Sequence, residues 1–153
     1  MHIKRSHNVS LLLYHIVLPA KYRKKVFSSE VTKCLLEICE QIEEVYEIYF
    51  LEIGSEQDHV HFLIQGLPTM TVTRIITILK SKSSNYLFQT CWWEIRKLLW
   101  WWKLRTSWYY VNTVWAFAGE QTIRAYIRNQ GKNEYEIWYK KQIDAWELPL
   151  FTT

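Results

Sequence analysis

Two histidines separated by one residue are the first residues in this sequence that could do chemistry. His59 and His61 flank Val60 in a segment rich in β-branched and aromatic residues. In a strand, residues i and i+2 point to the same face, so both imidazoles would project together. Two neighbouring imidazoles can chelate one divalent metal ion. The same pattern also fits two partly exposed histidines that bind nothing, so the motif alone leaves both interpretations open.

A tyrosine and a glutamine form the second pair. Tyr126 and Gln130 lie at positions i and i+4 of a segment expected to be helical, hence on one helix face. A phenol can attack phosphorus, but its pKa of about 10 leaves little phenolate at neutral pH, so it needs an adjacent cation. A metal held by His59 and His61 would meet that need, and the amide oxygen of Gln130 could complete its ligand set. The alternative is that Tyr126 packs beside the neighbouring isoleucines.

The elements that would hold these residues alternate between strands and helices. A run of apolar residues ended by Pro19 predicts a strand buried on both faces. Ser28 or Ser29 can cap the first of two amphipathic segments, and Thr71 can cap the second. The predicted elements are strands over 9–18, 46–53, 59–65 and 108–118, helices over 28–45 and 71–88, and a short helix over about 120–130 ended by Gly131. Apolar residues show no regular helical or strand spacing over 90–106, so no structure is predicted there.

This order predicts an α+β fold. The pattern βαββαβ gives a ferredoxin-like antiparallel sheet with helices on one face, followed here by a C-terminal helix that carries Tyr126. The 153 residues, 49% of them hydrophobic, fit a single domain over 1–153, with a charged and aromatic tail over 132–153. The other face of the sheet has no predicted helix against it, so it is available for a functional site or for packing against another segment.

Composition and charge narrow the classes of partner. No run approaches the roughly 20 apolar residues of a membrane span, and the start of the chain lacks an apolar signal core, so we expect a cytoplasmic protein without a membrane partner. The net charge is +4, and clustered basic residues suit a polyanion, although a solvated surface would explain them too. The candidate phosphate contacts are Lys21, Arg23, Lys24, Arg74, Lys80 and Lys82.

Taken together, these motifs resemble those of the HUH single-tyrosine transposases of small bacterial and archaeal insertion sequences. The likeness is an HxH pair in the second strand of a hairpin, followed after a helix and a strand by YxxxQ in a short helix. It extends from Tyr14 to Gly131 and includes HIVLPAKYRKKVF (15–27), SEQDHVHFLI (55–64) and IRAYIRNQG (123–131). The Trp-rich segment 92–108 is more aromatic than this family leads us to expect.

The resemblance implies roles for the four residues. His59 and His61 would be the paired metal ligands, Gln130 the third ligand and Tyr126 the nucleophile. Family enzymes cut single-stranded DNA beside a hairpin at the end of the element, leaving a 5′-phosphotyrosine and a free 3′-OH that later rejoins. They are homodimers in which the tyrosine helix docks on the partner's histidines, so the active sites are shared.

Several points stay open at this stage. Oxygen and imidazole ligands admit Mg²⁺ or Mn²⁺, and Glu56 and Asp58 could orient an imidazole or add a ligand. Two other functions remain. A non-catalytic RNA-binding module shares the βαββαβ order, although its RNP1-like glycine and aromatic pattern is absent here. A metal-dependent phosphohydrolase could use the HxH pair, but that hypothesis leaves Tyr126 without a role.

Overall fold

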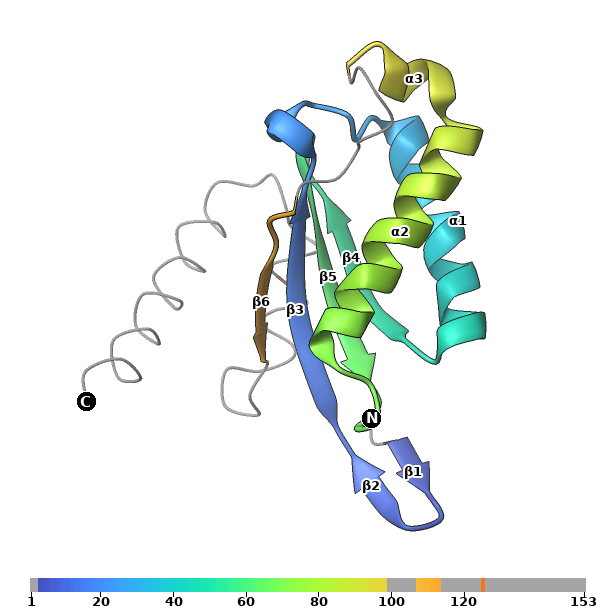
Figure 1. The fold of residues 1–153 in the computed structure, drawn as a ribbon, viewed down its shortest axis with the longest axis vertical. Coiled ribbons are helices and arrows are strands. Elements are labelled where there is room, and N and C mark those ends of the chain that lie inside the picture. Colours follow the sequence, from blue (N-terminus) through green and yellow to red (C-terminus); the bar gives the residue numbers. More distant parts are fainter. Residues whose placement is uncertain (1–2, 99–106, 114–124, 126–153) are drawn as a thin grey trace, which may run out of the picture.

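An antiparallel sheet with two long helices against one face forms the centre of the molecule (Figure 1). The structure is a computed structural model, and it describes residues 3–98, 107–113 and 125. Its elements are β1 (Ile3–Arg5), β2 (Asn8–Ser10), β3 (Leu12–Pro19), the 3-10 helix η1 (Lys21–Arg23), α1 (Ser29–Tyr46), β4 (Tyr49–Ser55), β5 (His59–Gly66), α2 (Val72–Thr90), α3 (Trp92–Arg96) and β6 (Tyr110–Thr113).

The strand order of the main sheet is β4-β5-β3-β6, with every neighbouring pair antiparallel. The first and third of the four strands in chain order, β3 and β5, therefore lie side by side in the interior, and β4 and β6 form the edges. This arrangement, together with α1 and α2 between the strands in the sequence, confirms the predicted α+β fold with a βαββαβ order.

The core lies between the sheet and the two helices. Alternate residues of β3 and β5, such as Ile16, Val60 and Phe62, point toward α1 and α2 and are buried there. Both helices begin at the predicted caps. The Ser28 hydroxyl accepts a hydrogen bond from the backbone N–H of Val31 at 3.3 Å, and Thr71 caps α2 in the same way. In the described part of the chain, no helix combines the length and apolar character needed to cross a membrane.

The first predicted strand is wrong at its beginning. Val9 was expected to start the buried strand, but it lies in β2, which pairs with β1 as a separate hairpin, and 61% of its surface is exposed. The reason is that the ladder with β5 begins only at Leu12, opposite Gly66, so the residues before it have no place in the main sheet. The ion pair of Arg5 with Glu47 ties this hairpin to the end of α1.

Three other boundaries differ from the prediction. The helix α1 runs through Tyr46, so the strand predicted over 46–53 begins at Tyr49 instead. The segment 90–106, for which no structure is predicted, contains the short helix α3. Of the strand predicted over 108–118, residues 110–113 form β6 and 114–118 lie outside the described residues. The predicted tyrosine helix over about 120–130, apart from residue 125, and the tail over 132–153 also lie outside them.

Because the apolar run is divided between β2 and β3, truncations in the two strands should affect the free energy of unfolding differently. Truncating the fully buried Ile16 to alanine should lower the free energy of unfolding by about 2–5 kcal/mol, because it leaves a cavity between the sheet and the helices. Val9→Ala should change it by less than about 0.5 kcal/mol, because Val9 is exposed. Urea denaturation followed by circular dichroism measures both. Equal losses in the two variants would contradict the boundary between β2 and β3.

Candidate active site

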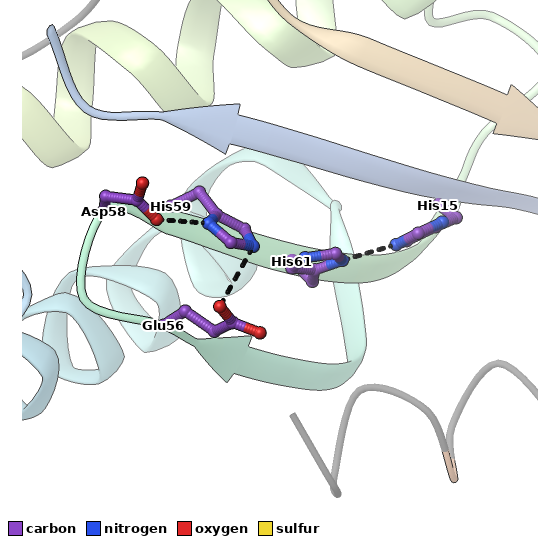
Figure 2. Close-up of polar contacts among 5 residues, drawn as sticks. All are labelled: His15, Glu56, Asp58, His59 and His61. Atoms are coloured by element: carbon purple, nitrogen blue, oxygen red, sulfur yellow. Dashed lines mark hydrogen bonds and ion pairs between the residues drawn. The ribbon is translucent and has the colours of Figure 1, made fainter. Parts of the chain in front are cut away.

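The paired histidines belong to β5, a strand in the interior of the sheet. Val60 and Phe62 point into the core, so His59 and His61 point to the opposite face, and their ring centroids are 4.9 Å apart. Because β5 is paired on both sides, a shift of one residue would move every side chain to the other face, which its buried core residues forbid. The sheet thus holds the two imidazoles side by side, as their spacing predicts (Figure 2).

The turn that leads into β5 is fixed to the loop that follows β3. The backbone N–H of Ala20 donates to the carbonyl of Asp58 at 2.8 Å, and that of Phe27 donates to the carbonyl of Gln57 at 3.0 Å. Within the turn, the N–H of Glu56 donates to the carbonyl of His59 at 2.9 Å. These bonds hold two carboxylate residues beside His59. They also hold residues 20–27, which include η1, at the histidine end of the sheet.

Each carboxylate approaches a different nitrogen of His59. Asp58 Oδ1 lies 2.6 Å from Nδ1, and Glu56 Oε2 lies 3.8 Å from Nε2 (Figure 2). A carboxylate that accepts a hydrogen bond from Nδ1–H fixes the ring orientation and leaves the lone pair on Nε2. Asp58 therefore suits the orienting role that the sequence analysis considered, whereas Glu56 lies on the side where an ion bound at Nε2 would be.

A third histidine, missed in the sequence analysis, lies against His61. His15 comes from β3 and is fully buried, and its Nε2 atom is 3.0 Å from Nδ1 of His61. The two rings stack with centroids 5.2 Å apart. The available signal was a single histidine inside the apolar run that precedes Pro19.

Burial keeps this histidine pair neutral. Desolvation lowers the pKa of His15 from 6.5 to about 3. The pKa of His61 falls to about 2, mainly because of its burial and further because of the neighbouring His15 and His59. A metal ligand must be a neutral imidazole, so neither ring needs to lose a proton at neutral pH before it can act as a ligand or as a hydrogen-bond partner.

The donors gathered here fit a divalent cation. One ligand atom from each of Glu56, Asp58 and His59 can be chosen so that all three lie within 4.8 Å of one another. We consider Asp58 the least suited of the three to bind an ion directly, because its carboxylate already binds Nδ1 of His59. Imidazole nitrogens with a carboxylate oxygen form a mixed set that Mn²⁺ and Mg²⁺ accept.

The other predicted site residues are not all brought to this face. Tyr126 and Gln130 lie outside the described residues. Lys21 and Lys24 lie in the loop that is hydrogen-bonded to the turn before β5. The side chain of Arg23 falls outside the described part of the structure. These three residues remain predicted phosphate contacts.

The basic residues of α2 belong to the helix layer that covers one face of the sheet (Figure 1). The histidines point to the other face, because Val60 and Phe62 point into the core beneath the helices. Lys80 donates to the carbonyls of Ser107 and Trp108, both at 3.1 Å, and lies 5.0 Å from the ring centroid of Tyr109. It therefore ties α2 to the segment before β6. Arg74 and Lys82 are exposed. Phosphate binding by these three residues remains a prediction.

Comparison with known proteins identifies the family of this chain. Residues 8–130 match the model of a family described as "Transposase IS200 like". The transposase of insertion sequence IS200 from Salmonella typhimurium is 33% identical over 122 residues, which cover 76% of this chain and 75% of the relative. The transposase TnpA of ISDra2 from Deinococcus radiodurans is 28% identical over 123 residues, covering 80% and 86% of the two chains.

Solved structures share the fold. The crystal structure of a presumed transposase from Deinococcus radiodurans R1 superposes with a TM-score of 0.66 at 26% identity, covering 84% of this chain and 97% of that one. A REP-associated tyrosine transposase bound to a REP hairpin gives a TM-score of 0.51 at 7% identity, covering 83% and 68% of the two chains, and supports the fold alone.

A ferredoxin-like sheet that presents an HxH pair on an interior strand defines the HUH class of transposase, and the comparisons agree with this class. The chain belongs to the IS200-like transposase family. It is therefore a transposase, an enzyme that binds and cleaves DNA during transposition.

The buried neutral histidines predict loss of stability in mild acid. Their pKa values are lower in the folded state, so the unfolded state takes up more protons as the pH falls below 6.5. Between pH 7.5 and 5.5, His15 and His61 should each lower the free energy of unfolding by roughly 1 kcal/mol.

Urea denaturation at both pH values, in the presence of chelator, measures this loss. His15→Phe should remove about half of the loss, whereas replacing the exposed His7 by phenylalanine should leave it unchanged. A wild-type free energy that is the same at both pH values would contradict burial of the neutral rings.

Proposed function

We propose that this transposase cuts and rejoins single-stranded DNA at hairpin-marked ends of an insertion sequence, through a 5′-phosphotyrosine formed on Tyr126. In this proposal His59, His61 and Gln130 hold a divalent metal ion, Mg²⁺ or Mn²⁺. The observation that carries the proposal is the side-by-side placement of His59 and His61 on one strand, with Asp58 and Glu56 beside them. Family membership supports the same assignment.

The proposed reaction needs no external energy source. The phenol oxygen of Tyr126 forms a bond to the scissile phosphorus, and the bond from phosphorus to the 3′ oxygen breaks. The phenol proton is balanced by the proton that the 3′-OH gains. The phosphodiester energy is kept in the covalent link, so the reverse attack by a 3′-OH restores a continuous strand.

The chain's own residues supply the positions for this step. When bound, the metal would polarise the scissile phosphate and offset its developing negative charge. Asp58 holds the ring of His59, and the sheet holds His59 next to His61. The loop with Lys21 and Lys24 is fixed to the same turn and offers cations for the DNA backbone.

The hairpin substrate and the homodimer come from the family resemblance. The structural neighbour bound to a REP hairpin is consistent with a hairpin partner for this fold. A site shared between subunits would bring the partner's Tyr126 to the histidines of this chain. Trp or Tyr side chains of the Trp-rich segment 92–108 would stack on unpaired bases, which is worth about 1–3 kcal/mol for each base.

The first test is the covalent adduct. Tyr126→Phe should still bind an oligonucleotide that carries a hairpin and a single-stranded flank, but it should form no covalent adduct, since only the nucleophilic oxygen is lost. A denaturing gel with labelled DNA measures the adduct. Tyr22→Phe, which alters an exposed tyrosine of η1, is the matched control and should form the adduct normally.

Three results would contradict parts of this mechanism. An adduct that persists in Tyr126→Phe would remove Tyr126 from its role. Full cleavage by the wild type in excess chelator would exclude the metal. Cleavage without any attachment of DNA to protein would favour a metal-dependent phosphohydrolase, and binding without cleavage would favour a non-catalytic nucleic-acid module.

The second test concerns the shared site. Tyr126→Phe subunits are mixed with subunits in which both His59 and His61 are alanine, and the two are allowed to exchange. In each heterodimer, one site combines intact histidines with an intact tyrosine, so cleavage should return. Equal mixing should restore about a quarter of the wild-type sites, because half of the dimers are mixed and each has one complete site.

The location of the adduct makes this test specific. It should be found only on the subunit that lacks the histidines, because that subunit retains Tyr126. Verified heterodimers that remain inactive would show that each site is built from a single chain. That outcome would exclude the shared site while leaving the tyrosine chemistry to the first test.

A further inference from the structure

We propose that His15 is a positioning residue for the metal site: it accepts a hydrogen bond from Nδ1–H of His61 and so leaves the lone pair of that ring on Nε2. The inference rests on the proposed function, in which His61 is a metal ligand. It assigns a role to a residue that lies on a different strand from the HxH motif and does not itself have to touch the metal.

The contact between the two rings is direct and buried. Nε2 of His15 lies 3.0 Å from Nδ1 of His61, and the exposed fractions of the two residues are 0% and 4%. In a pair of neutral imidazoles, one nitrogen of the contact donates and the other accepts. If His61 donates from Nδ1, its Nε2 atom has a lone pair for a metal. If His15 donates instead, Nε2 of His61 carries the proton and cannot be a ligand.

The sheet holds His15 where this contact can form. In the β3–β5 ladder His15 is opposite Leu63 and His61 is opposite Val17, so the two rings are diagonal neighbours on one face. The rings are nearly parallel, with 20° between their planes. Tyr110 of β6 approaches the ring of His15 at an angle of 71°, with centroids 6.1 Å apart. His15 is thus packed against aromatic rings from both neighbouring strands.

Burial makes an orienting role the better explanation for His15. A polar ring inside an apolar strand loses its hydration, and a leucine would fill such a place without that penalty. The hydrogen bond to His61 offsets the penalty, and an orienting task accounts for the burial of the two polar rings together. The neighbouring His59 has a comparable arrangement, with Asp58 on its Nδ1 atom. Both ligand rings of the motif therefore have a partner on the Nδ1 side, which would leave Nε2 as the ligand atom for a metal ion.

The experiment measures Mn²⁺ binding directly, independently of cleavage. Free Mn²⁺ is followed by electron paramagnetic resonance during titration of the wild type, His15→Phe, His15→Gln and the control Leu13→Ala. His15→Phe should weaken Mn²⁺ binding about 10- to 100-fold, as loss of an orienting partner does at other metal sites. His15→Gln should recover part of the affinity, because its side-chain oxygen can accept from Nδ1–H of His61.

Leu13→Ala separates orientation from stability. Leu13 is buried on the same strand and the same face as His15, so its truncation should lower the melting temperature. It should leave the Mn²⁺ affinity unchanged. If Leu13→Ala weakens binding as much as His15→Phe does, the effect is one of general stability and the proposal is overturned.

A measurement on the unaltered protein covers the case in which His15→Phe does not fold. In ¹⁵N-labelled wild type without metal, long-range proton–nitrogen spectra identify which nitrogen of His61 is protonated. We expect the proton on Nδ1. A proton on Nε2 would overturn the proposal whatever the variants do.

The outcomes also separate this proposal from the proposed function. Wild-type binding of Mn²⁺ that His59→Ala abolishes, together with unchanged affinity in a folded His15→Phe, would refute the role of His15 and leave the metal site intact. A wild type that binds no Mn²⁺ would refute the metal site itself, and the role of His15 with it.

Discussion

The pairing of β3 with β5 is the constraint on which the rest of the structure depends. These two interior strands share an antiparallel ladder from Leu12 opposite Gly66 to Pro19 opposite His59. Because side chains alternate between the faces, one register supplies both the core and the site. It directs Ile16 and Phe62 toward the helices and brings His15 to His61 on the other face. A slip of one residue would put the histidines in the core and the core residues on the site face.

Burial on the histidine face explains the polar contacts found there. Charged imidazoles would be costly in such surroundings, and desolvation accordingly lowers the pKa of both His15 and His61. A neutral imidazole still needs a partner for its N–H group, and each such partner also fixes a ring orientation. Here the partners come from different parts of the chain: Asp58 from the turn before β5 and His15 from the neighbouring strand. The packing that stabilises the sheet therefore also orients the candidate ligands.

Sequence patterns within a single element correctly predicted the features that depend on that element alone. The caps at Ser28 and Thr71 and the common face of His59 and His61 follow from spacing and residue type, and all appear in the structure. The family resemblance added the assignment to a transposase family, which the comparisons confirm. Prediction failed where the outcome depends on pairing between distant segments. Val9 looked like part of a buried strand until its pairing with Lys4 removed it from the main sheet. His15 was missed because its partner lies 46 residues away, and no pattern within one strand reveals a contact between two.

The charges around His59 bear on how this site could receive a phosphate. Asp58 and Glu56 both approach the ring, whereas the nearby His15 and His61 are neutral because they are buried. Without added positive charge, these two carboxylates would repel a DNA phosphate, and the partly buried setting would strengthen that repulsion. Two sources of positive charge fit the arrangement: a divalent ion bound at the imidazoles and carboxylates, and the basic loop that the backbone bonds from Ala20 and Phe27 fix to the same turn. The carboxylates would then help to bind the divalent ion and to orient the ring of His59. The divalent ion and the basic loop, not the neutral imidazoles, would attract the phosphate.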